Sequence, residues 1–101
     1  MEKITGNSTV VVTKDQVSAD LSGEAAILNL KSGVYFGLNA VGARIWNLLQ
    51  EPRTVSRIKD VILGEYEVGP DRCEADLFSL LNDLLLQGLI EIRNEKGPEV
   101  L

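Results

Sequence analysis

The sequence contains no histidine and only one cysteine, Cys73. These two residue types supply many of the nucleophiles, proton-transfer groups and zinc ligands of enzymes, so most enzyme classes and metal centres are excluded. A single cysteine also excludes an internal disulfide. A helix start near Cys73 can lower a thiol pKa, but the interpretation that we favour is a small residue beside the core. We therefore expect no catalytic residue, no metal and no cofactor.

Long apolar runs are missing as well. The first residues, MEKITGN, hold one lysine and no apolar stretch, which excludes a signal or transit peptide. Hydrophobic residues make up 45% of the chain and charged residues 25%, as is typical of a globular domain rather than a membrane span. We expect one cytoplasmic domain over residues 1–101, with no membrane contact and with flexible tails at residues 1–8 and 94–101.

Strand patterns occupy the first part of the chain. Thr9–Thr13 is rich in β-branched residues, and Val17–Leu21 either continues this strand or replaces it. Glu24–Leu30 and Val34–Leu38 are expected to form a hairpin around the small residues of Lys31–Gly33. Alternation in the last strand places one face in the core and leaves the other face available.

Apolar residues at spacings of three and four predict helices over residues 40–50, 54–67 and 70–88. Asn39 and Thr54 occupy N-cap positions of the first two helices. Asp71 and Glu74 have a spacing related to a capping box at the third, and Gly88 is suited to end it. Leu89–Ile92 is expected to form a short extended tail.

The helical core positions follow from the same spacing. They are Val41, Ile45, Leu48 and Leu49 in the first helix, Val55, Ile58, Ile62 and Tyr66 in the second, and Leu77, Leu81 and Leu84 in the third. Trp46 flanks the first stripe. We interpret it as a packing residue, the alternative being a partner surface.

The core stripe of the third helix has two different flanks. One carries Asp76, Leu80, Asp83 and Gln87, and the other carries Phe78, Leu85 and Leu89. Either flank is a candidate wall of a groove. The alternatives are a solvated face for the polar flank and additional core for the apolar flank.

Positive charge is scarce, with ten basic against fifteen acidic residues and a formal net charge of −5. A three-stranded antiparallel sheet followed by three helices is an α+β arrangement that resembles a winged helix-turn-helix, in which the third helix would contact DNA. That helix carries Asp71, Glu74, Asp76 and Asp83 against Arg72 alone, a charge of about −3. Phosphates would be repelled, so the charge argues against nucleic acid as a partner.

The strand Val34–Leu38 contains no proline and no charge that would blunt an open sheet edge. A peptide can add to such an edge as a further strand, forming backbone hydrogen bonds while its side chains enter pockets. The sequence therefore favours a peptide-binding mechanism without catalysis.

Four segments together resemble the PqqD-like peptide-recognition proteins, also called RiPP recognition elements. They are the hairpin AILNLKSGVYFGLN, the helix AVGARIWNLL, the helix entry TVSRI and the segment ADLFSLLNDLLLQGLIE. The resemblance covers about Val17 to Ile92, and its SGVYFGLNAVGARIW version looks most like the stand-alone recognition proteins of lasso-peptide biosynthesis.

The resemblance implies an adaptor that binds the leader of a ribosomally made precursor peptide and delivers it to a separate leader peptidase. It implies that the leader pairs with the third strand and lies against the third helix, and it implies a monomer or weak dimer. The implied leader-binding residues are Val34, Tyr35, Phe36, Gly37, Leu38, Asp76, Leu80, Asp83 and Gln87. Phe78 and Leu85 depart from the polar pattern expected there and suggest either a second contact surface or an unusual groove.

Two other classes remain open from the residues alone. A winged-helix transcriptional or generic interaction domain has the same element order. An enzyme would require a hidden acid pair such as Asp76 and Asp83, but seven helical residues separate two carboxylates by roughly 10 Å, too far to share a proton. We expect solvated carboxylates.

Overall fold

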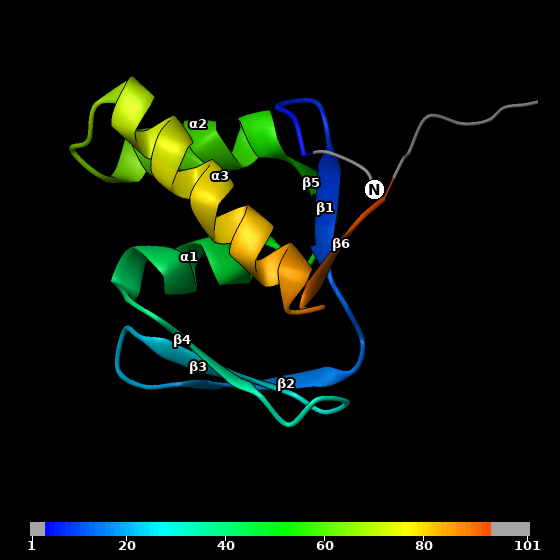
Figure 1. Ribbon diagram of the computed structural model, residues 1–101. Coiled ribbons are helices and arrows are strands. Elements are labelled where there is room, and N and C mark those ends of the chain that lie inside the picture. Colours follow the sequence, from blue (N-terminus) through cyan, green and yellow to red (C-terminus); the bar gives the residue numbers. More distant parts are fainter. Residues whose placement is uncertain (1–3, 94–101) are drawn as a thin grey trace, which may run out of the picture.

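The computed structural model describes residues 4–93 (Figure 1). Its elements, in chain order, are β1 (Thr9–Val12), β2 (Gln16–Asp20), β3 (Ala25–Asn29), β4 (Tyr35–Leu38), α1 (Ala40–Leu48), β5 (Arg53–Thr54), α2 (Val55–Glu65), α3 (Pro70–Leu86) and β6 (Ile90–Ile92). This confirms the α+β class and a three-stranded antiparallel sheet followed by three helices.

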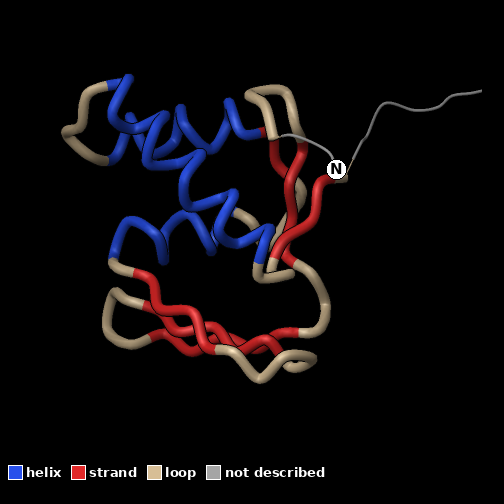
Figure 2. Tube along the Cα trace, viewed as in Figure 1, coloured by secondary structure: helices blue, strands red, loops and turns tan. Residues whose placement is uncertain are grey.

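The strands form two separate sheets, which Figure 2 shows as two groups of red segments. One sheet has the order β2-β3-β4 and contains the expected hairpin. The other has the order β5-β1-β6. The two candidates for the first strand, Thr9–Thr13 and Val17–Leu21, therefore both form strands, but they belong to different sheets.

The second sheet corrects the expected C-terminal tail. Residues 90–92 form β6, which pairs antiparallel with β1 so that Val10 lies opposite Ile92 and Val12 opposite Ile90. Val10 is fully buried in the resulting core. Because these partners lie some eighty residues apart in the sequence, no local pattern predicts that the two strands pair.

All three helices start where the sequence predicts, and two of the three predicted N-terminal caps are present. Asn39 Oδ1 accepts a hydrogen bond from Gly42 N at 2.9 Å, and Thr54 Oγ1 accepts one from Arg57 N at 3.2 Å. The capping box expected at α3 is wrong, because Gly69 is the N-cap and provides no side-chain cap. The φ of +72° at Gly88 confirms the left-handed residue expected after this helix.

Glu74 has a different partner from the one that a capping box requires. Its carboxylate accepts a hydrogen bond from Lys59 Nζ at 2.7 Å, which joins α3 to α2. This hydrogen bond raises the pKa of the Lys59 ammonium group. Pro70 and Asp71 in the first turn are sufficient to start the helix, since proline suits that turn and an acid there favours the helix dipole.

The core lies between the β2-β3-β4 sheet and the helices, with α1 directly on the sheet (Figure 1). Most of the expected core residues are buried, whereas Val41 and Tyr66 are half-buried. Trp46 is 2% exposed, and its Nε1 donates a hydrogen bond to Ser18 Oγ on β2 at 3.2 Å. The tryptophan therefore packs as predicted, between α1 and the sheet.

The first described residues do not form the expected tail. Ile4 is buried, and Gly6 O accepts hydrogen bonds from Ser56 N and Ser56 Oγ at 3.0 and 2.9 Å. Residues 4–8 therefore pack against the start of α2 because Ile4 adds apolar area to the core. The other residues of the two expected tails, 1–3 and 94–101, lie outside the described residues.

Candidate peptide-binding site

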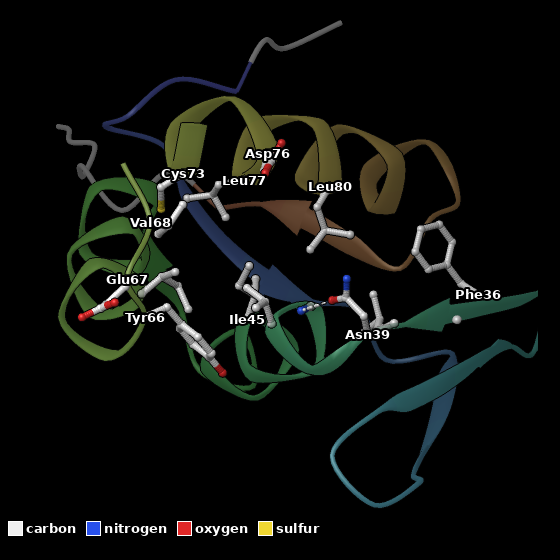
Figure 3. A pocket seen from close by; sticks show the side chains of 15 residues that line it. Phe36, Asn39, Ile45, Tyr66, Glu67, Val68, Cys73, Asp76, Leu77 and Leu80 are labelled. Carbon is white, nitrogen blue, oxygen red and sulfur yellow. Dashed lines mark hydrogen bonds between the residues drawn. The ribbon is translucent and has the colours of Figure 1, made fainter. Parts of the chain in front are cut away.

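A cavity of about 600 Å³ opens between β4 and α3 (Figure 3). Phe36, Gly37 and Leu38 of β4 form one wall, and Cys73, Asp76, Leu77 and Leu80 of α3 form the other. The floor comes from α1, and the far end is closed by the segment that joins α2 to α3. We call this space the β4–α3 groove.

The edge of β4 that faces away from β3 has no pairing partner among residues 4–93. Asn29 N donates a hydrogen bond to Val34 O at 3.0 Å, so these residues lie at a hydrogen-bonded position of the hairpin. Because hydrogen-bonded and non-bonded pairs alternate in an antiparallel ladder, Phe36 and Leu38 also bond to β3. The N–H and C=O groups of Tyr35 and Gly37 consequently point outward and are free to bind another strand.

Side chains of β4 alternate between the two faces of the sheet. Leu38 is buried and Phe36 half-buried, and both line the groove, as the sequence alternation predicts. Tyr35 is 71% exposed on the opposite face, while Val34 at the turn is 45% exposed. The strand therefore presents apolar side chains to the groove and free backbone groups at its edge.

Five of the nine residues expected to bind a leader line this cavity, namely Phe36, Gly37, Leu38, Asp76 and Leu80. The other four lie elsewhere. Val34 and Tyr35 precede the cavity on the hairpin, and Asp83 and Gln87 are exposed on α3 toward its C-terminal end. The structure thus brings the middle of β4 and the first half of α3 together at the cavity.

Phe78 and Leu85 are half-buried and pack against the core. Neither is among the residues that line the groove. This position favours the packing interpretation of the apolar flank, and a contact role for the two side chains stays a prediction.

Sequence reasoning missed the far end of the groove, which Tyr66, Glu67 and Val68 form. The end of α2 is held on α1 by a double hydrogen bond from Arg44 to Glu65, at 2.8 and 2.7 Å. This contact lowers the pKa of the Glu65 carboxyl, and the next residue, Tyr66, lines the cavity. The sequence pattern indicated only a core position for Tyr66 at the end of the second helix, because the direction of its side chain depends on tertiary packing.

Gly42 in the floor was missed as well. A Cβ atom at this position would lie 3.2 Å from Leu38 Cδ2, so a larger residue would press on the groove-lining leucine. The glycine allows α1 to start immediately beneath β4. A glycine one turn after a helix N-cap was the sequence signal for this close approach.

Acidic groups stand near the mouth of the groove. Asp76 accepts a hydrogen bond from Arg72 Nε at 3.2 Å, but both side chains are exposed. Glu67 adds a second carboxylate to the lining. Basic side chains do not occur in the lining itself, so the described groove has an acidic character.

Cys73 is 5% exposed, and burial raises the pKa of its thiol. A redox role would need a lowered pKa, so the core interpretation is supported. Residues 4–93 contain no group of three or more cysteine or acidic side chains suited to hold a metal. No helix in this part of the chain is both long and apolar enough to cross a membrane.

The face of the β2-β3-β4 sheet opposite the helices is uncovered (Figure 1). By strand alternation it carries Val17, Leu21, Leu28, Leu30 and Tyr35, and we call these residues the outer face. Four of the six large apolar side chains that are exposed among residues 4–93 belong to it. Val17, Leu28 and Tyr35 are direct neighbours across the three strands.

A known protein family and solved structures match this chain. The sequence model of the family described as coenzyme PQQ synthesis protein D (PqqD) matches residues 24–90, about two thirds of the chain. The chain belongs to the PqqD family. The matched residues include the β3–β4 hairpin, all three helices and both walls of the groove.

Two solved structures resemble this PqqD-family chain. One, described as TbiB1 in complex with the TbiA(beta) leader peptide, is 39% identical with a TM-score of 0.76 and covers 84% of this chain and 99% of its own. The second, a lasso peptide synthetase B1 complexed with the leader peptide, is 23% identical with a TM-score of 0.71 and covers 81% and 96%. The second likeness shows the fold alone. Comparison with the curated proteins gives no match.

Proposed function

We propose that this chain is a non-catalytic adaptor of lasso-peptide maturation. It binds the leader of a precursor peptide as a strand added to β4 and presents it to a separate leader peptidase. The observation that carries the proposal is the free edge of β4 beside the β4–α3 groove. The similarity to a protein described in complex with a leader peptide supports the choice of ligand.

The free edge supplies directional binding. Tyr35 and Gly37 each offer one N–H and one C=O, so an added strand can form up to four backbone hydrogen bonds. Each bond contributes about 0.5–1.5 kcal/mol net. Alternate leader side chains then point toward the groove, where Phe36, Leu38 and Leu80 provide apolar surface.

The proposal is tested by hydrogen exchange of individual amides. The probe is a synthetic peptide with the sequence of the TbiA(beta) leader, which the 39%-identical protein is described as binding. Addition of this peptide should slow exchange at Tyr35 and Gly37, whose amides are otherwise free. Phe36 and Leu38 are internal controls because their amides already bond to β3. Unchanged exchange at both Tyr35 and Gly37 under saturating peptide would contradict strand addition.

The acidic side chains of α3 should contribute modestly to leader binding. In the double variant Asp76→Asn, Asp83→Asn we expect the affinity to fall by about twofold to thirtyfold, because each of the two exposed ion pairs contributes about 0.2–1 kcal/mol. Calorimetry at low and high salt measures this, and salt should weaken the wild type more than the variant. Since Arg72 competes for Asp76, Arg72→Gln is the matched control and should bind the leader at least as well as the wild type. An unchanged affinity in the double variant would leave both aspartates as ordinary surface.

We place the peptidase on the outer face. A leader strand on β4 would extend the β2-β3-β4 sheet beside Tyr35, so the leader and the outer face would form one continuous surface. An exposed apolar surface of this kind usually marks a contact with another protein. Phe78 and Leu85 expose less apolar surface because they are half-buried. A peptidase on this surface would contact the adaptor and its bound leader together.

Val17→Asp tests this placement because Val17 is 52% exposed on β2, away from the proposed leader edge. We expect leader affinity within twofold of the wild type but cleavage of the loaded leader by the peptidase slowed about tenfold or more. The matched control is Leu86→Asp, which introduces the same charge at a 73% exposed leucine on α3. Equal cleavage rates in the two variants would argue against the outer face.

A further inference from the structure

Asn29, the last residue of β3, is the one polar side chain that is buried among residues 4–93, with 8% of its surface exposed. Its Nδ2 donates a hydrogen bond to Gln87 O at 2.6 Å. Its Oδ1 accepts hydrogen bonds from Lys31 N at 2.8 Å and Ser32 N at 3.2 Å. The side chain therefore makes three of the four hydrogen bonds that an amide can form, and both of its ends are engaged, as is usual for a buried polar group.

These bonds join the two walls of the β4–α3 groove. On one side Asn29 shapes the turn that leads into β4, and its backbone N–H donates to Val34 O while its C=O accepts from Gly33 N. On the other side it binds the carbonyl of Gln87, the C-cap of α3. In the described part of the chain this is the hydrogen bond that connects the β3–β4 hairpin with α3, and the cavity lies further along between the same two elements.

We propose that Asn29 is a positioning residue for peptide binding, which fixes the spacing between β4 and α3 that an inserted peptide strand requires. The inference rests on the function proposed above. Asn29 does not line the groove, but in this proposal it affects how tightly the groove binds a peptide. A groove that is correctly spaced only part of the time binds with an affinity reduced by that fraction.

The chemistry of the amide explains why asparagine fits this position. One end must donate to a carbonyl, while the other must accept from two backbone N–H groups. An amide satisfies both ends at once, whereas an ionised carboxylate offers acceptors only. Asn29→Asp therefore keeps the contacts of the turn but directs an oxygen toward Gln87 O, which selectively removes the connection to α3.

The test compares Asn29→Asp with Thr13→Ala. Thr13 Oγ1 donates to Gly88 O at 2.9 Å, so the control removes a similar bond to the adjacent carbonyl without touching the hairpin. We expect leader affinity per folded molecule to fall about tenfold in Asn29→Asp and to stay within twofold in Thr13→Ala. Urea unfolding of both variants measures the purely structural loss. Equal losses of affinity in the two variants, or none in Asn29→Asp, would overturn the positioning role.

A measurement on the wild type covers the case in which Asn29→Asp does not fold. Leader binding should slow solvent exchange of the Asn29 side-chain amide, because an occupied groove keeps the hairpin and α3 together. Unchanged exchange of this side chain, with Tyr35 and Gly37 protected, would overturn the Asn29 inference alone. If the leader protects neither Tyr35 nor Gly37, the proposed function itself fails.

Discussion

Tyr35→Pro is expected to lower leader affinity by at least about 100-fold. Proline removes the outward N–H of residue 35, and its ring occupies the space where the added strand would pair. The hairpin should persist, since the N–H of Tyr35 makes no bond to β3. Titration of a labelled leader peptide measures the affinity, and circular dichroism checks the fold.

Two control variants separate the backbone from other effects. Tyr35→Ala keeps the N–H and removes only an outer-face side chain, so leader affinity should remain within about threefold. Asp20→Pro introduces proline at the free edge of β2, on the other side of the same sheet, and should leave leader binding intact. If Tyr35→Pro still binds at the wild-type level, the leader does not add to β4.

The structure also settles which proline variant is informative. From the sequence alone, either Phe36 or Tyr35 could present its N–H at the edge, because alternation gives two possible registers. The hydrogen bond from Asn29 N to Val34 O fixes the register and turns the amide of Phe36 toward β3. Phe36→Pro would therefore damage the hairpin itself, and its loss of binding would not test strand addition.

The hairpin and the helices could be predicted because their signals are local. Strand alternation, the turn at Lys31–Gly33 and the caps at Asn39 and Thr54 act over a few residues. The same signals gave the order of the elements. The resemblance to a known family implied that the strand with Phe36 and Leu38 faces the helix with Leu80, and it implied the type of ligand.

The remaining features depend on contacts between distant segments. The β5-β1-β6 sheet joins residues near positions 10, 53 and 91, and no pattern within one segment specifies that pairing. Tyr66 reaches the groove because of how the end of α2 packs beside α1, where Arg44 bonds to Glu65. A capping box was expected at Asp71 because the sequence pattern does not show that Glu74 reaches Lys59 on another helix.

The short strand β4 combines three separable contributions. Its outward backbone groups at Tyr35 and Gly37 are suited to pair with a peptide, and the side chains of Phe36 and Leu38 form a wall of the groove. The ring of Tyr35 lies on the outer face. Backbone and side-chain variants at position 35 should therefore affect different partners, the leader in one case and the peptidase in the other.

Trp46→Ala is expected to reduce the free energy of unfolding by about 3–5 kcal/mol. The side chain is 2% exposed between α1 and the sheet, so truncation leaves a large cavity and leaves Ser18 without the indole donor. Small domains have a stability of about 5–15 kcal/mol, so this variant should be only marginally folded. Urea unfolding followed by circular dichroism measures the change, since the chain has no other tryptophan to report by fluorescence.

Trp46→Phe distinguishes packing from a partner contact. It keeps an aromatic ring in the core and removes the bond to Ser18, so we expect a loss of about 1–2 kcal/mol in unfolding. Leader affinity per folded molecule should stay within twofold, because Trp46 does not line the β4–α3 groove. A tenfold weaker leader affinity with unchanged stability would instead make this tryptophan a contact residue and would require a binding surface on the β2 side of α1.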